Sequence, residues 1–320
     1  MCRTDFVFLD DFLKDISTVA IAGHIRPDGD CVGSCLAVYN YICDNYPGIR
    51  ADLYLEPIPE KFSFLENAQK IQSAKDVGAA AHDLFIALDC GDGERLGDAA
   101  RFFGTAKKTL CIDHHLTNRS FADVNEVHPE ASSTSELVYL AMDPERVTEK
   151  IAECLYLGIA HDTGIFQYSC TSPRTMRIAG ELMEKGIPYS RIVDETYYIR
   201  SYAQQRIWGK AMADSRLYLD GKCIFTMVSR KDMEEFGVTP ADLDGIVSEL
   251  RSTTGVEVSV FLYELEDGYK ISLRSASYVD VARIAAEFGG GGHARAAGAS
   301  SGKMPEEILG ILLDKIRMQL

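Results

Sequence analysis

Short apolar runs alternate with longer segments of mixed polarity through the first half of the chain. Four of the runs have the length of strands and lie at 19–24, 51–56, 84–89 and 109–113. Five segments carry apolar residues at helical spacing, at about 31–46, 94–103, 134–142, 147–160 and 174–185. Strands that alternate with helices predict an α/β domain with a doubly wound parallel sheet.

The pattern changes after a long helical segment at 188–215. Beyond it, two pairs of apolar runs flank Asp220-Gly221 and Asp267-Gly268, dipeptides that are typical of hairpin turns. Further helical patterns lie at 239–252, 279–288 and 305–318. We therefore expect a larger α/β domain at 1–187, which would be the catalytic one, a helical connector at 188–215 and a smaller α+β domain at 216–320.

Composition and charge narrow the classes of protein. The 320 residues carry a formal net charge of −15, which argues against binding to long duplex nucleic acid. There is no apolar run of membrane-spanning length and no signal-peptide core near the N-terminus. Nine cysteines without C-x-x-C pairs indicate mostly buried thiols in a reducing compartment. These features predict a cytoplasmic protein that binds short anions or divalent cations.

Acids and histidines gather where the predicted strands and one helix end. They are His24, Asp28, Asp30, Asp89, Asp113, His114, His115, His161 and Asp162. The carboxyl ends of parallel strands meet at one edge of a sheet, so these side chains should share a small volume. Each acid taken alone is more commonly a helix cap or a turn residue, and a single D-T-G does not make an aspartic protease.

Carboxylates held that close together repel each other unless cations neutralise them. A set of oxygen and nitrogen ligands without sulfur suits Mn²⁺ best, with Mg²⁺, Fe²⁺, Co²⁺ and Zn²⁺ open as alternatives. A pair of such metals activates water and positions a phosphate for in-line attack. The cluster therefore predicts two divalent metal ions and the hydrolysis of a phosphoester or phosphoanhydride.

The segment 288–300 contains four consecutive glycines, followed by His293 and Arg295. It matches neither a Walker loop nor a dinucleotide-binding fingerprint. Consecutive glycines let backbone N–H groups approach an anion, and Arg274 at the end of the preceding strand can join them. A flexible linker is the alternative.

The order H-x-x-x-D-x-D, D, D-H-H, D-T-G and G-G-G-G-H-x-x-A-A-G resembles that of the DHH phosphoesterases with a DHH-associated C-terminal domain. The match extends over nearly the whole chain. The length of the chain is similar to that of one branch of the family. This branch contains the nano-RNases, which are oligoribonucleases, and the phosphatases of 3′-phosphoadenosine 5′-phosphate (pAp). The resemblance implies a cleft between the two domains.

The resemblance also implies a role for each site residue. One metal would be held by His24, Asp28 and Asp89, and the other by Asp30, Asp89, His114 and Asp162, with Asp89 bridging the two. His115 would face the scissile phosphate, and Asp113 would orient an imidazole. The substrate-binding residues would be Arg274, Ser275, Gly290, Gly291, Gly292, His293 and Arg295.

By the same resemblance we expect a Mn²⁺-dependent hydrolase of very short RNA, of dinucleotides such as pApA, or of pAp, and a homodimer formed through the first domain. Three other functions stay open: a cyclic di-AMP phosphodiesterase, an inorganic pyrophosphatase, and a nucleotide sensor without catalysis. The glycine-rich segment argues against the pyrophosphatase, and the complete ligand set argues against the sensor.

Overall fold

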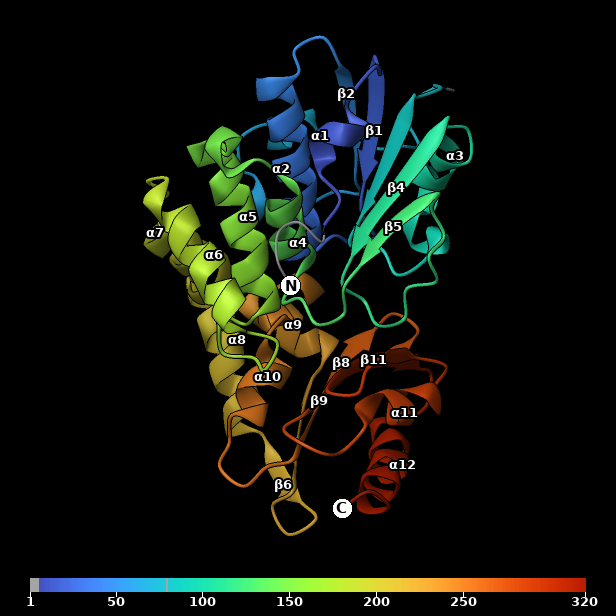
Figure 1. Ribbon diagram of the computed structural model, residues 1–320. Helices are drawn as coiled ribbons and strands as arrows, with labels where there is room; N and C mark the ends of the chain where they lie inside the picture. Colours follow the sequence, from blue (N-terminus) through green and yellow to red (C-terminus); the bar gives the residue numbers. More distant parts are fainter. Residues whose placement is uncertain (1–5, 79) are drawn as a thin grey trace. The chain divides into compact units, whose positions relative to one another are not determined.

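The computed structural model describes residues 6–78 and 80–320 (Figure 1). The chain divides into two compact units: the first ends at Ile199, and the second comprises Arg200–Leu320. This division lies inside the segment 188–215 that we expected to connect two domains. Each unit has its own sheet and its own hydrophobic clusters.

The first unit contains a five-stranded, wholly parallel sheet in the order β2-β1-β3-β4-β5. Its strands are β1 (Thr18–Ala22), β2 (Arg50–Tyr54), β3 (Leu84–Leu88), β4 (Lys108–Asp113) and β5 (Val124–Val127). The first four are the strands that the sequence predicted. The edge strand β5 was missed because its residues are only half-buried and form no apolar run.

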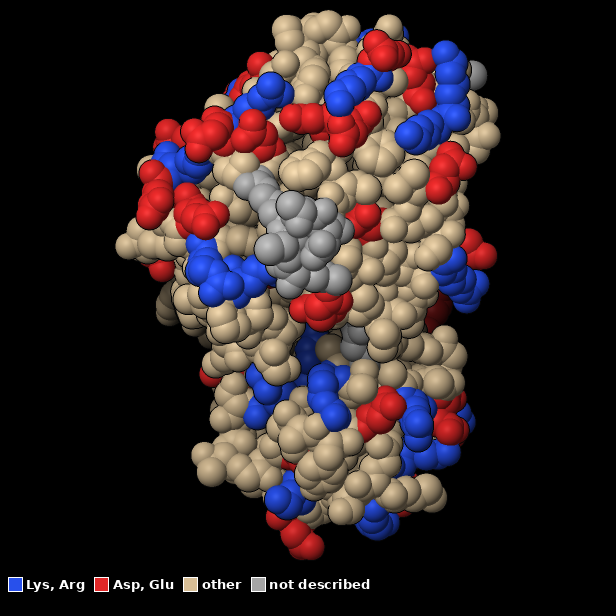
Figure 2. All heavy atoms as spheres, viewed as in Figure 1, with Lys and Arg blue, Asp and Glu red and all other residues tan. Residues whose placement is uncertain are grey.

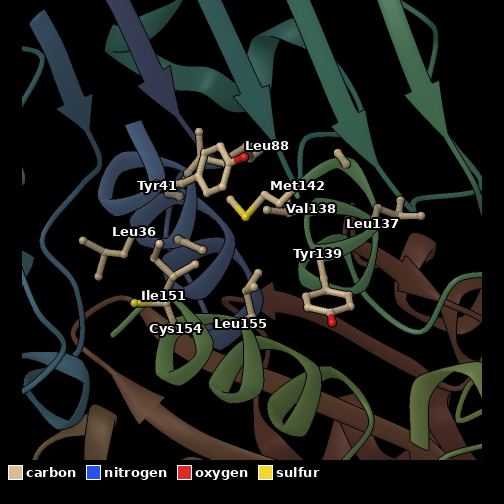
Figure 3. Close-up of a cluster of buried hydrophobic side chains, with 14 of the residues drawn as sticks. Leu36, Tyr41, Leu88, Leu137, Val138, Tyr139, Met142, Ile151, Cys154 and Leu155 are labelled. Carbon is tan, nitrogen blue, oxygen red and sulfur yellow. The ribbon is translucent and has the colours of Figure 1, made fainter. Parts of the chain in front are cut away.

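Both faces of this sheet are covered, as a doubly wound fold requires. In β1, Val19 and Ile21 belong to the cluster on one face, and Ala20 and Ala22 belong to the cluster on the other. The larger cluster packs against α2 (Gly29–Asn45), α4 (Thr134–Ala141), α5 (Glu149–Asp162) and α6 (Pro173–Glu184). Figure 3 shows its side chains from α2, α4 and α5 in contact beneath the sheet. On the opposite face lie the 3₁₀ segment Gly93–Ala99 and α3 (Ala100–Phe103).

The predicted long helix at 188–215 is interrupted. It consists of α7 (Tyr189–Val193), a π-helical turn at Asp194–Tyr198, and α8 (Tyr202–Ala213). A capping box begins α8, in which Ser201 and Gln204 each bond the other's backbone N–H. This start signal is why the helical pattern does not run through. Among the described residues, no helix is both long and apolar enough to cross a bilayer.

The second unit is a six-stranded mixed sheet in the order β10-β11-β9-β8-β7-β6. Its strands are β6 (Arg216–Tyr218), β7 (Cys223–Val228), β8 (Val258–Leu265), β9 (Gly268–Ser275), β10 (Gly291–His293) and β11 (Ala296–Ser301). The β6–β7 and β8–β9 pairs are antiparallel hairpins, which confirms both predicted turns. One hydrophobic cluster includes α11 (Val281–Ala286) and α12 (Pro305–Arg317), and another includes α8, α9 (Arg230–Phe236) and α10 (Ile246–Arg251).

The helix expected at 239–252 is broken at Gly245. The residue has a φ of +88°, and a Cβ there would lie 2.8 Å from the Trp208 ring. Glycine is therefore required both by the backbone and by the close approach of the ring. The segment forms a 3₁₀ turn at Pro240–Leu243, and α10 follows the break.

Candidate metal centre

The strand order places the candidate residues at one crevice. The chain first runs from β1 to β2 on one side, and then crosses back to β3 on the other side of β1, from which β4 and β5 continue outward. At such a switch point the connections leave the sheet on different faces, which opens a crevice beyond the carboxyl ends of the strands. His24 lies just after β1, and Asp89 directly follows β3. Both therefore border the crevice.

Asp89 is the centre of the cluster. Its Oδ2 lies 3.3 Å from His24 Nε2, and its Oδ1 lies 3.7 Å from His114 Nε2 and 3.6 Å from His115 Nδ1. The residue is buried and has a φ of +57°, a conformation uncommon outside glycine. Its backbone N–H donates to Ile112 O at 3.1 Å, which helps hold this conformation. Strain of this kind is concentrated at functional sites.

On one side of Asp89 lies a group made by His24 and Asp28. His24 Nδ1 is 2.8 Å from the backbone oxygen of Ile25, which turns Nε2 toward the carboxylates. Asp28 Oδ2 lies 3.6 Å from that Nε2. The other oxygen of Asp28 caps α2 by accepting from the N–H groups of Asp30 and Cys31. The cap fixes the position of Asp28, although its side chain is open to solvent.

On the other side lies a group made by Asp30, His114 and Asp162. One ligand atom from each lies within 4.8 Å of the others, and His114 Nε2 is 3.1 Å from Asp162 Oδ2. Asp30 belongs to α2, His114 follows β4, and Asp162 ends α5. Three elements that are distant in the sequence therefore bring their side chains together at one small site.

The electrostatics of the cluster call for positive charge. Burial and the nearby charges of Asp89 and Asp162 raise the pKa of Asp30 well above its usual value. Burial alone would lower the pKa of His24, but the Asp28 and Asp89 carboxylates raise it to about 12. Asp30 and His24 therefore both bind protons more tightly than usual, because a proton reduces the negative charge of the cluster. Carboxylate oxygens and imidazole nitrogens so arranged fit a divalent cation, which supplies the same compensation.

Asp113 orients His115. Its Oδ1 lies 2.7 Å from His115 Nδ1, and its Oδ2 accepts from Asn118 Nδ2 at 2.6 Å. Asp113 is fully buried, so its position does not depend on solvent. The two histidines of the D-H-H motif are separated by these contacts: His114 faces Asp162, and His115 faces Asp113.

The N-terminus of α4 also contributes to the cluster, and sequence reasoning missed it. The backbone N–H groups of Thr134 and Ser135 donate to Asp30 at 2.6 and 2.9 Å. The Thr134 hydroxyl donates to Asp89 Oδ1 at 3.1 Å. A helix N-terminus favours a nearby carboxylate. The available signal was the S-x-x-E sequence at 133–136, whose Ser133 caps the start of this helix by accepting from the Glu136 N–H.

Three of the predicted substrate-binding residues lie near one another in the second unit. Arg295 Nη1 donates to Ser275 Oγ at 3.2 Å and to Val279 O at 2.8 Å. Arg274 precedes Ser275 at the end of β9 and is paired in register with Ala296. The side chain of His293 lies outside the described part of the chain, so its predicted role stays a prediction.

The glycines of this segment form the β10–β11 hairpin instead of an open loop. A Cβ on Gly290 would lie 2.2 Å from Gly298 O, and one on Gly292, at φ +144°, would lie 2.4 Å from Ala296 O. Both positions require glycine because the two strands pack closely. Gly291 has open space beside it. Packing thus accounts for two of the glycines without reference to an anion.

A buried carboxylate, Glu257, supports the same region and was not predicted. It accepts from Ser275 Oγ at 3.0 Å and from the backbone N–H groups of Ser277, Tyr278 and Val279 at 3.1, 2.8 and 3.0 Å. Burial opposes its ionisation, but these hydrogen bonds hold its pKa at about 2. Glu257 therefore fixes the turn that carries both bonding partners of Arg295.

Comparisons with known proteins match both units. The model of the DHH family, N-terminal domain, matches residues 18–159, and the model of the DHHA1 domain matches residues 220–319. The bifunctional oligoribonuclease and PAP phosphatase NrnA of Thermus thermophilus is 31% identical, over 88% of this chain and 83% of that protein. The protein of the same name from Bacillus subtilis is 28% identical, over 88% and 89%. The crystal structure of an exopolyphosphatase-related protein from Bacteroides fragilis is 26% identical and has a TM-score of 0.89, covering 97% of this chain and 94% of that one.

Proposed function

The chain belongs to the DHH family, and from that premise we propose that it is a dimetal phosphoesterase of very short RNA and of pAp. It would convert dinucleotides such as pApA to 5′-mononucleotides, and pAp to AMP and phosphate. The observation that carries the proposal is the cluster centred on Asp89, in which one carboxylate contacts the histidines of both candidate metal groups. Its relatives from Thermus thermophilus and Bacillus subtilis are named for these two activities.

The residues that would hold the metals are the two groups already described. His24, Asp28 and Asp89 would hold one ion, and Asp30, Asp89, His114 and Asp162 would hold the other. Two bound Mn²⁺ ions would lower the pKa of water and neutralise the charge that develops on the reacting phosphate. We propose Mn²⁺ because carboxylate and imidazole ligands suit it.

His115 is the residue that we assign to the substrate phosphate. The Nδ1 of His115 is hydrogen-bonded to Asp113, so Nε2 is the nitrogen that would act on a phosphate oxygen. Burial would lower the pKa of His115, but the hydrogen bond to Asp113 and the charge of Asp89 raise it. A raised pKa favours the imidazolium form, which donates a proton to the leaving oxygen.

The second unit would bind the rest of the substrate. Arg295 and Arg274 supply positive charge at the end of β9, where Ser275 and Val279 hold the Arg295 guanidinium in place. A net charge of −15 disfavours a long polyanion, so a short substrate suits this chain better. On the face shown in Figure 2, acidic and basic side chains are interspersed over the first unit without a continuous basic surface. We also propose that the protein acts in the cytoplasm. We propose that it forms a homodimer, and analytical sedimentation would test this oligomeric state.

A panel of substrates tests the proposal. Purified chain with Mn²⁺ is incubated with pApA, a five-nucleotide RNA, a long RNA, pAp, cyclic di-AMP and pyrophosphate, and the products are separated by chromatography. We expect rapid hydrolysis of pApA and of pAp, slower cleavage of long RNA, and little hydrolysis of pyrophosphate. The proposal fails if pyrophosphate is the only good substrate, if cyclic di-AMP is preferred to pApA, or if long RNA is cut as fast as pApA.

Variants connect that activity to the cluster. Asp89→Asn should remove activity on every substrate, because the carboxylate serves both groups. Asp92→Asn is a matched control: Asp92 lies on the same loop and only caps the following 3₁₀ turn, a role that asparagine can keep. Activity that survives Asp89→Asn would exclude the two-metal assignment.

A further inference from the structure

The crevice contains a sulfur atom that the sequence analysis did not place there. Cys31 lies in the first turn of α2 and is fully buried. Its Sγ, one ring nitrogen of His24 and one carboxylate oxygen of Asp89 all lie within 4.8 Å of one another. All three side chains are more than nine-tenths buried. The His24 position therefore offers nitrogen, oxygen and sulfur to a cation, whereas the sequence indicated only nitrogen and oxygen.

The backbone beside His24 leaves room for this sulfur. A Cβ on Gly23 would lie 2.2 Å from Cys31 Sγ and 3.1 Å from Cys35 Sγ. Glycine thus lets the sulfur pack directly against the chain that leads into His24. The described hydrogen bond of the Cys31 thiol is donated to His24 O at 3.8 Å. A thiol is a weak donor, so little hydrogen-bond energy is lost when a metal ion replaces this bond. The larger cost is the proton, because burial and the contact with Cys35 raise the pKa of Cys31 well above its usual value.

Sulfur changes which metals the position prefers. Thiolate ligands favour soft and borderline cations such as Zn²⁺ and Cd²⁺, whereas Mn²⁺ favours carboxylate and water. We propose that Cys31 is a further protein ligand, beside His24, Asp28 and Asp89, for thiophilic divalent cations at this position. The thiol loses its proton to solvent as the sulfur–metal bond forms, so binding releases one proton from Cys31.

This inference rests on the proposed function in one respect: the position beside His24 would also bind Mn²⁺ in the hydrolase. With Cys31 added to His24, Asp28 and Asp89, zinc would have four protein ligands, the number of a closed tetrahedral site, which would leave less access for water and substrate. Cys31 would therefore make the enzyme sensitive to inhibition by Zn²⁺ and Cd²⁺. At this one position, the thiolate would favour Zn²⁺ and Cd²⁺, whereas the carboxylates would favour Mn²⁺.

The test is a titration of the metal-free full chain with Cd²⁺, in which ultraviolet absorption reports sulfur-to-cadmium charge transfer. We expect an absorption band that saturates with Cd²⁺, decreases in Cys31→Ser, and is suppressed by excess Mn²⁺. The Cd²⁺ affinity should fall about 10-fold or more in Cys31→Ser, at least as much as when a supporting contact of a metal ligand is lost. Cys223→Ser is the matched control, since Cys223 is an equally buried cysteine in the second unit. A band of the same intensity and affinity in Cys31→Ser would overturn the inference.

Cadmium-113 NMR of the wild-type chain keeps the test decisive if Cys31→Ser does not fold. A resonance that competes with Mn²⁺ and has the shift of a sulfur-bound ion supports the proposal, and one with the shift of purely oxygen and nitrogen ligands refutes it. The hydrolysis panel is a separate readout. Sulfur binding without hydrolysis would remove only the proposed function, and hydrolysis without sulfur binding would remove only this inference.

Discussion

The position of Asp89 between the two proposed metal groups predicts that one substitution weakens both groups together. Asp89→Asn removes the negative charge that lies 3.3 Å from His24 Nε2 and 3.7 Å from His114 Nε2. Asparagine tolerates the left-handed backbone of this position, so the local conformation should survive. Asp28→Asn is the comparison, because among the described contacts Asp28 pairs with the histidine of one proposed metal group, His24, and asparagine can keep its cap on α2.

The expected effect follows from mass action. A cation at 100 times its Kd stabilises the folded state by about 2.7 kcal/mol, so two independent ions contribute about 5 kcal/mol. At about 2–4 °C per kcal/mol for a unit of this size, Mn²⁺ should raise the Tm of the first unit by roughly 10–20 °C. If Asp89→Asn weakens each site about 10- to 100-fold, only about 1–3 kcal/mol of that stabilisation remains. Asp28→Asn should keep the full contribution of the other ion.

Calorimetry of the full chain, with chelator and then with Mn²⁺, measures these shifts. The only tryptophan, Trp208, lies in the second unit, so its fluorescence identifies the transition that belongs to that unit. The remaining transition reports the first unit. The reasoning is refuted if Asp89→Asn loses no more of the Mn²⁺-induced shift than Asp28→Asn does. In the hydrolysis assay, Asp89→Asn should lower kcat at least about 10²- to 10³-fold.

Three further outcomes are expected. Thr134→Val removes the hydroxyl bond to the bridging carboxylate and should weaken Mn²⁺ binding about 10- to 100-fold by isothermal titration, while an unchanged Kd would contradict this role. Gly292→Ala should lower the stability of the second unit by more than about 1 kcal/mol in urea unfolding followed by Trp208 fluorescence, whereas Gly291→Ala should change it by less than about 0.5 kcal/mol; equal effects would exclude the packing explanation. The pKa of Glu257 is about 2 in the folded state against 4.5 ordinarily, so its contribution of about 3 kcal/mol is present above pH 4.5 and is lost as the pH falls toward 2. Glu257→Gln should remove that part of the pH dependence, and a wild-type acid transition that Glu257→Gln leaves unchanged would show that the carboxylate does not contribute.

The fold was predictable where the local pattern was strong. Four strands of the first unit and both hairpins of the second have apolar runs or turn dipeptides that identify them. Strand β5 was missed because it is half-buried, and helix α9 because it is short and mainly charged. The break at Gly245 depends on the ring of Trp208, which comes from a different helix. Such contacts leave no periodic signal in the segment itself.

The glycine-rich segment shows how a correct local inference can have a different cause. Four consecutive glycines predicted that the backbone approaches another group closely. In the structure, that group at Gly290 and Gly292 is the neighbouring strand β11. The sequence could not distinguish an anion from a strand, because both require the absence of a side chain.

The sequence by itself determined which residue types meet at the strand ends of the first unit. Asp and His residues at the ends of successive elements indicated a metal site, since parallel strands bring their carboxyl ends together in any order. Only the tertiary structure decided which residues touch. The strand order placed Asp89 between His24 and His114, the start of α4 brought Thr134 to Asp89, and the packing of α2 against Gly23 brought the sulfur of Cys31 beside His24. Distances of a few ångströms depend on how separate elements pack, and residue type and spacing along one segment do not contain that information.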